Sequence, residues 1–276
     1  MSTTRMSPLR LLFSGLLDDA AMFPPGNATS AAALDAHLAH RASWYADLVG
    51  PLLVHCDRWP EFVAAHAHAG APDVEVGLIG SAELPSDVPA DVRVIGSETV
   101  VRQLPLPAGG TGRVLACEVS ADPAGFEAFA EIARSRARGE AVIGKYRTGG
   151  TTPEAFPSID QLVAVVMAAA AAEAPMKFTA GLHHAARFTA ADTGFEHHGF
   201  LNLLVAVEAA RRGAAEPTLA ALLGERDAGR LAATVTSWTE DQFSGVRSAF
   251  VSFGCCGVQD PVNDLVALQL IDKEDV

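Results

Sequence analysis

Lysine is scarce in this chain, and two of its three lysines lie in short apolar runs. The sequence has 276 residues and 20 basic side chains, of which only Lys145, Lys177 and Lys273 are lysines. Lys145 lies in the apolar run 141–147 and Lys177 in the run 176–180, and both runs have the composition of β-strands. We therefore expect these two lysines at matching depths on neighbouring strands, and Lys273 in solvent.

Two ammonium groups held close together repel each other, and each is expected to lower the pKa of the other. A lysine that is neutral near pH 7 can attack a carbonyl group and form an imine, which accepts electrons when a carbon–carbon bond is made or broken. This chemistry makes Lys145 and Lys177 candidate catalytic residues. The alternative is that both lysines bind an anionic substrate, or that one of them pairs with Glu118.

An anion-binding segment follows Lys145 directly. Arg147 shares the strand face of Lys145, because side chains alternate along a strand. The guanidinium group offers fixed donors, and glycines let backbone N–H groups approach an oxygen. We therefore predict substrate contacts from Arg147, Thr148, Gly149 and Gly150.

The two later strands add further candidates. Thr179 and Gly181 share the face of Lys177. Gly254 lies near the end of the last expected strand, where barrels often bind phosphate. Cys255 and Cys256 follow it, but the sequence supplies no orienting base for a thiol, so we expect them to fill space in the core.

Acidic and histidine side chains are candidates for proton transfer. They are also candidate metal ligands, which gives one competing hypothesis. Glu118 ends a strand, and we predict that Glu118 or His183 moves protons in the reaction. Adjacent histidines on a strand point to opposite faces, so each histidine pair offers one metal ligand at most. A divalent metal held by His183, His198 and Glu118 is therefore the alternative site.

Short apolar runs alternate with alanine-rich helical stretches along the whole chain. The expected strands are Leu11–Leu17, Leu48–His55, Val74–Ile79, Val92–Gly96, Arg113–Glu118, Ala141–Arg147, Met176–Ala180 and Ser248–Phe253. The expected helices are Ala31–Ala46, Trp59–His68, Ser97–Leu104, Pro123–Arg138, Ser158–Ala174 and Phe200–Arg212, with one or two more in Thr218–Gln242 and an irregular link at Ser81–Val88.

This alternation predicts an α/β fold, a (β/α)₈ TIM barrel that forms a single domain over residues 1–276. Parallel strands need crossover helices, and eight such strands in about 250 residues match a barrel. Ser158 and Gln161 form a capping box that fixes one helix start. A doubly wound open sheet is the alternative, but the glycine-rich nucleotide motifs typical of open sheets are missing from the sequence.

Composition excludes several classes of partner. A net charge of −13 opposes binding to the phosphate backbone, so no nucleic acid is expected as partner. The run Leu9–Leu17 is too short to span a membrane, and no membrane association is expected. The four cysteines show no CxxC spacing, which favours free thiols in the cytoplasm. The expected partner is a small anionic substrate. The sequence leaves open whether the chain forms a homo-oligomer.

Three motifs resemble those of deoxyribose-phosphate aldolases. Segment 145–149 (KYRTG) is similar to their K-x-x-T-G, 177–182 (KFTAGL) to K-x-[ST]-x-G-[IL], and 252–256 (SFGCC) to R-F-G-x-S, with Ser252 in place of Arg and Cys256 in place of Ser. The resemblance implies a metal-free barrel in which Lys145 forms the Schiff base and Lys177 perturbs it. Only Asp91 is a candidate for the aspartate of the aldolase proton relay.

The chain also resembles a widespread set of uncharacterised bacterial proteins. The shared elements are FPP at 23–25, KxRxGG at 145–150, FxAGLHH at 178–184 and HGFLN at 198–202. This second resemblance adds His184, His198 and Asn202 to the predicted substrate contacts.

Together these observations predict a Schiff-base lyase of aldolase type that cleaves or forms a carbon–carbon bond in a small phosphorylated or carboxylated carbonyl compound. No cofactor is expected beyond the covalent imine on Lys145. One alternative is a metal-assisted hydrolase or isomerase that uses the histidines with Glu118. The other is a non-catalytic barrel that binds a metabolite.

Overall fold

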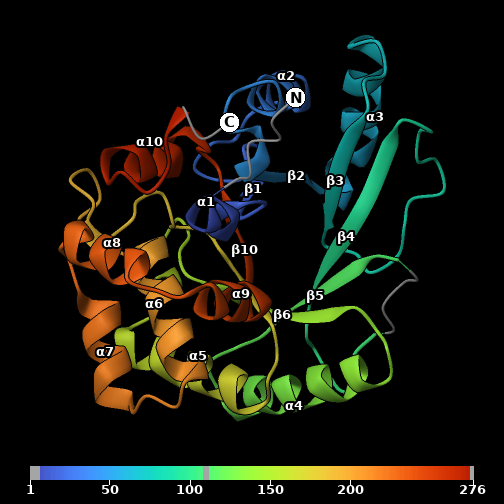
Figure 1. Ribbon diagram of the computed structural model, residues 1–276. Coiled ribbons are helices and arrows are strands. Elements are labelled where there is room, and N and C mark those ends of the chain that lie inside the picture. The colour runs from blue at the N-terminus through green and yellow to red at the C-terminus, as the bar shows by residue number, and fades with distance from the viewer. Residues whose placement is uncertain (1–6, 108–111, 274–276) are drawn as a thin grey trace.

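The computed structural model describes residues 7–107 and 112–273. Eight of its strands close into a parallel barrel (Figure 1). Their order around the barrel is β1-β10-β7-β6-β5-β4-β3-β2. They are β1 (Leu17–Asp19), β2 (Val49–His55), β3 (Val74–Ile79), β4 (Val92–Val100), β5 (Val114–Glu118), β6 (Val142–Arg147), β7 (Met176–Thr179) and β10 (Phe250–Cys255). The short strands β8 (Phe188–Thr189) and β9 (Glu196–His197) pair separately. The predicted (β/α)₈ barrel is therefore confirmed.

The helices pack around the barrel, and most lie where the sequence predicts them. They are α1 (Pro8–Phe13), α2 (Ser30–Arg41), α3 (Trp59–His68), α4 (Pro123–Ala137), α5 (Ile159–Ala171), α6 (Phe200–Arg211), α7 (Glu216–Gly224), α8 (Ala228–Thr236), α9 (Glu240–Ala249) and α10 (Gln259–Ala267). The capping box of Ser158 and Gln161 opens α5 as predicted. The link at 81–88 contains no helix or strand, in agreement with its irregular sequence.

The first strand lies later than predicted. The expected strand Leu11–Leu17 is wrong, because α1 occupies Pro8–Phe13 and β1 begins only at Leu17. Ser7 caps α1 by accepting a hydrogen bond from the Arg10 backbone N–H, and proline is well tolerated in a first helical turn. The Ser-Pro pair is thus a helix-start signal that outweighs the apolar run.

The fourth strand is longer than predicted, and it replaces an expected helix. The helix Ser97–Leu104 is wrong, because β4 continues through Ser97 to Val100. Each residue from Ser97 to Val100 is paired with β5, and Ser97 and Glu98 are also paired with β3. Pairing on both sides keeps this stretch extended and places Glu98 inside the sheet. In Figure 1, β3 and β4 stand on the right, away from helices α5 to α9.

The C-terminal part contains three helices, α7, α8 and α9, where one or two were expected. The last strand runs from Phe250 to Cys255 rather than from Ser248 to Phe253, because Ser248 still belongs to α9. This shift brings Cys255 into the strand and sets Cys256 directly at its carboxyl end.

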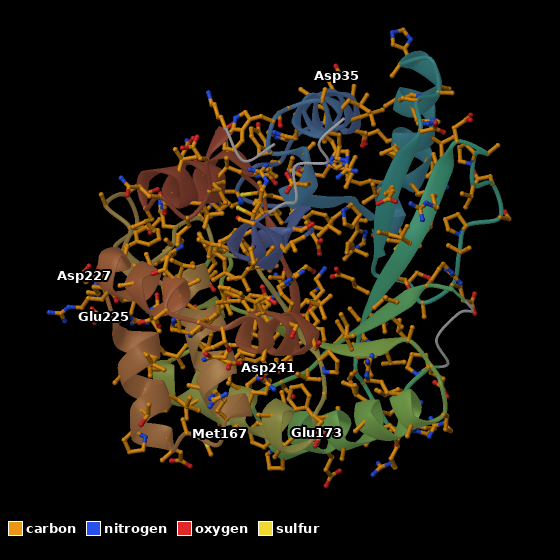
Figure 2. The ribbon with its side chains drawn as sticks, viewed as in Figure 1. Asp35, Met167, Glu173, Glu225, Asp227 and Asp241 are labelled. Carbon is orange, nitrogen blue, oxygen red and sulfur yellow. The ribbon has the colours of Figure 1, made fainter. Side chains whose placement is uncertain are left out.

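The stretch Pro153–Ala171 is long and apolar enough to cross a membrane by length and composition alone. Within it, α5 buries one face, including Leu162 and Val166, in the core of the protein. Many acidic side chains lie on the outer helices and loops, and Figure 2 labels several of them. The labelled Asp35, Glu173 and Asp241 are all exposed.

Candidate active site

Polar side chains form a row at one level around the inside of the barrel. Lys145 on β6 is the register partner of Lys177 on β7, so the predicted matching depth is confirmed. On either side, Glu118 of β5 pairs with Lys145 and Ser252 of β10 pairs with Lys177. The parallel register therefore places two buried ammonium groups next to each other.

A carboxylate that the sequence did not single out lies between the two lysines. Glu98 Oε2 is 2.6 Å from Lys145 Nζ, and Glu98 Oε1 contacts Lys177 Nζ. All three side chains are only 5–6% exposed. Burial alone would raise the pKa of Glu98, but the ammonium groups of Lys177 and Lys145 outweigh it and lower the pKa to about 2. Glu98 is therefore ionised at neutral pH.

Lys177 has a second carboxylate partner on β1. Asp18 Oδ2 is 2.5 Å from Lys177 Nζ and accepts a hydrogen bond from Ser252 Oγ at 2.8 Å. Burial opposes the charged form of Lys177, but Asp18 and Glu98 overcome it and raise the pKa of Lys177 above its ordinary value. The expectation that two ammonium groups lower each other's pKa is thus wrong for Lys177, because carboxylates separate and neutralise them.

Lys145 has two carboxylate partners as well. Glu118 Oε2 lies 2.8 Å from Lys145 Nζ, and Glu118 Oε1 lies 3.2 Å from Arg147 Nε. The interaction anticipated between Glu118 and one lysine is therefore present. Burial would raise the pKa of Glu118, but Lys145 and Arg147 lower it below its ordinary range.

Asp91, the candidate for the aldolase proton relay, is not part of this network. Asp91 is exposed just before the first residue of β4, away from both lysines. Glu98 lies further along the same strand and contacts both ammonium groups. Sequence reasoning missed it because Glu98 fell in a stretch expected to be helical. The available signal was a pair of β-branched residues on each side of residues 96–98, Val94 and Ile95 before them and Thr99 and Val100 after them.

A cavity of about 190 Å³ opens above this network at the carboxyl ends of the strands, where barrel enzymes bind substrate. The predicted site residues that line it are Lys145, Arg147, Gly150, Thr179, Gly181, His183 and Gly254. Glu98 and Cys256 also line it, whereas Lys177 lines a separate cavity of about 200 Å³ beneath it with Asp18 and Ser252. Lys145 is thus the lysine that faces the mouth of the barrel.

Arg147 stands at the rim of this cavity. Its side chain is 50% exposed, and its ion pair with Glu118 uses only the Nε edge. A guanidinium group has five N–H donors. Arg147 therefore has donors left for an anionic group of a ligand.

Thr148 and Gly149 hold two loops together instead of lining the cavity. The Thr148 hydroxyl donates to the Ala180 carbonyl oxygen at 2.6 Å, and the side chain is buried. A Cβ on Gly149 would lie 2.9 Å from Gly181 Cα, and Gly181 itself has a φ of +77°. Glycine at positions 149 and 181 lets the β6 and β7 loops approach each other, and the Thr148 hydrogen bond links the two loops.

His184, His198 and Asn202 also lie outside the cavity lining. His184 contacts Asp264 at 3.2 Å on the surface. His198 is fully buried, with Nε2 2.7 Å from the Pro157 carbonyl oxygen and Nδ1 3.1 Å from Arg187 Nη1. These positions do not support the predicted substrate contacts.

Asn202 is satisfied entirely by backbone groups. Its Oδ1 accepts from the Arg187 N–H, and its Nδ2 donates to the carbonyl oxygens of Leu222 and Glu225. Asn202 thus joins the loop after β7 to the end of α7, which is a structural role.

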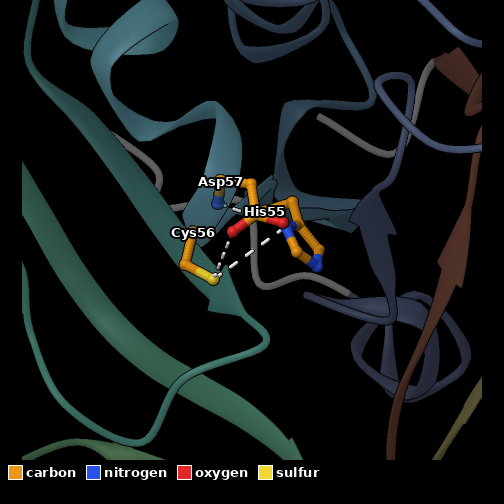
Figure 3. A group of neighbouring side chains, drawn as sticks. All are labelled: His55, Cys56 and Asp57. Atoms are coloured by element: carbon orange, nitrogen blue, oxygen red, sulfur yellow. Dashed lines mark hydrogen bonds and ion pairs between the residues drawn. The ribbon is translucent and has the colours of Figure 1, made fainter.

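The histidines predicted as metal ligands do not gather around Glu118. Both ring nitrogens of His198 already have partners, and Glu118 is engaged by Lys145 and Arg147. In the described part of the chain, the group close enough to hold a metal is instead His55, Cys56 and Asp57, at the end of β2 and the start of the 3₁₀ turn Cys56–Arg58 (Figure 3).

No family model, curated protein or solved structure matches this chain. The function is therefore inferred from the fold and from the side chains of the site.

Proposed function

We propose that the protein is a Schiff-base lyase of aldolase type in which Lys145 forms the imine. One observation carries the proposal: Lys145 lies in the wall of the barrel-mouth cavity, and its amine is in contact with two carboxylates, Glu98 and Glu118. An amine that attacks a carbonyl must first lose a proton, and both acceptors lie within hydrogen-bond distance.

Each carboxylate that contacts Lys145 also contacts a second cation, which is Lys177 for Glu98 and Arg147 for Glu118. Glu98 is shared, so it stays paired with Lys177 when Lys145 becomes neutral. Lys177 is held as a cation by Asp18 and Glu98. A buried carboxylate without a cation would be strongly unfavourable, and this arrangement avoids it. Lys177 thus supports the reaction by holding Glu98 and its charge in place.

The reaction then follows from the chemistry of an imine. Lys145 Nζ attacks the carbonyl carbon, and loss of water from the adduct gives the imine. The imine nitrogen draws in the electron pair of the breaking carbon–carbon bond, while a carboxylate of the network takes the proton of the substrate hydroxyl. An aldehyde leaves, and protonation and hydrolysis of the remaining enamine restore the Lys145 amine.

The cavity supports a small anionic substrate. A volume of about 190 Å³ suits a small molecule. Arg147 at the rim offers free donors to a carboxylate or phosphate. The proposed substrate is therefore a small phosphorylated or carboxylated carbonyl compound, processed in the cytoplasm without a further cofactor.

Reductive trapping tests the proposal. The protein is incubated with a panel of phosphorylated and carboxylated aldehydes and ketones, glyoxylate among them, then treated with borohydride and read by intact mass. We expect a stable adduct in the wild-type protein that disappears in Lys145→Met, which removes the amine and keeps the volume of the side chain. Lys273→Met is the matched control and keeps the adduct, because Lys273 is exposed near Trp44.

Two outcomes would overturn the proposal. One is that no compound of the panel gives an adduct with the wild-type protein. The other is that the adduct persists in Lys145→Met and maps to another amine. Unchanged ligand binding in Lys145→Met with no adduct anywhere would favour a non-catalytic metabolite-binding barrel.

A further inference from the structure

A second nucleophile faces the same cavity as Lys145. Cys256 follows β10 and lines the barrel mouth together with His183. Its Sγ lies 3.7 Å from His183 Nε2. This contact supplies the base that the sequence alone did not reveal for either cysteine.

The neighbours of His183 fix which ring nitrogen accepts a proton. Nδ1 lies 3.5 Å from Asp260 Oδ2 and 3.7 Å from Cys255 Sγ. The Cys255 thiol donates its own proton to the Gly257 carbonyl oxygen at 3.3 Å, so its sulfur faces His183 as an acceptor. With two acceptors at Nδ1, the ring carries its proton there, and the lone pair of Nε2 points to Cys256.

The three side chains therefore have the roles of a nucleophile, a base and a group that orients the base. We propose that Cys256 is a nucleophilic thiol activated by His183, with Asp260 as positioning residue, and that it adds reversibly to a small anionic aldehyde in the cavity. The aldehyde is the product that the proposed lyase reaction releases, so this part of the inference rests on the proposed function.

The addition balances without any further reactant. The sulfur forms a bond to the aldehyde carbon, and the π-electron pair of the carbonyl moves to its oxygen. The thiol proton passes to His183 Nε2 and then to that oxygen, which gives a neutral hemithioacetal. Burial raises the pKa of the Cys256 thiol and lowers the pKa of His183, so both start neutral and the histidine acts as a general base.

Alkylation of the folded protein tests the activation of the thiol. Rates with iodoacetamide are followed by peptide mass mapping, and we expect His183→Gln to slow modification of Cys256 about 100-fold. Cys56, in the 3₁₀ turn after β2, is the internal control, and its rate should not change. An equal rate at Cys256 in the two proteins would overturn the inference.

Glyoxylate labelled at its aldehyde carbon tests the adduct by NMR. We expect a hemithioacetal signal in the wild-type protein, in Lys145→Met and in the control Cys56→Ser, which lies outside the cavity lining, and its loss in Cys256→Ser. A missing signal in the wild-type protein, or one that persists in Cys256→Ser, would overturn the inference. Because the Cys256 adduct does not use the Lys145 amine, failure of the lyase proposal is distinguishable from failure of this one.

Discussion

Glu98 Oε2 lies 2.6 Å from Lys145 Nζ inside the barrel, where both side chains are almost completely buried. The other oxygen of the same carboxylate contacts Lys177. A single buried carboxylate thus pairs with two ammonium groups. Glu118 is the second carboxylate partner of Lys145, and Asp18 is that of Lys177. The stability of the site and the reactivity of Lys145 both depend on this arrangement.

Glu98→Gln is predicted to destabilise the protein by about 3–5 kcal/mol, because the network then holds three cations against only two carboxylates, Asp18 and Glu118. The effect should depend on pH. The pKa of Glu98 is about 2 in the folded protein against an ordinary 4.5, so its stabilisation is complete above pH 4.5 and is lost as pH falls toward 2. Urea unfolding over this pH range should therefore show the wild type and the variant converging.

The control for this prediction is Glu173→Gln, which removes a carboxylate from an exposed position. It should leave both the free energy of unfolding and its pH dependence nearly unchanged. The same pH dependence in wild type and Glu98→Gln would contradict the role given to Glu98.

Arg147→Gln is predicted to weaken binding of anionic carbonyl compounds. A hydrogen bond to a charged group contributes about 1.5–3 kcal/mol, so half-saturation of the borohydride adduct by glyoxylate should need at least about tenfold more glyoxylate. Trapping of acetaldehyde, which is neutral, should not change. Arg230→Gln, at an exposed position of α8, is the matched control. A similar loss with both aldehydes would argue for general damage to the site.

His198 is predicted to act on stability and not on substrate binding. Burial lowers its pKa from 6.5 to about 4, so the unfolded chain takes up the proton first as pH falls. Stability should therefore decrease between pH 6.5 and 4, and this part of the decrease should be absent in His198→Gln. Thermal or urea unfolding measures it, with the exposed His68→Gln as control. Loss of the glyoxylate adduct in folded His198→Gln would contradict the assignment.

The sequence predicted the barrel well because local patterns encode it. Apolar runs and alanine-rich stretches alternate at the spacing of β–α units, and the capping box at Ser158 fixes a helix start. The errors fell where pairing or capping competes with a local pattern. The apolar run from Leu11 became partly helix α1, and the stretch after Gly96 stayed in β4 because both of its neighbours pair with it.

The sequence alone predicted Lys145 and Lys177 at matching depths on neighbouring strands, because adjacent parallel strands place equivalent residues side by side. Only the tertiary structure decided what surrounds them. Asp18 reaches Lys177 because barrel closure sets β1 beside β10, and Glu98 reaches both lysines across the barrel interior. Contacts between side chains far apart in the sequence arise from closure of the whole sheet, and no local pattern of residues encodes them.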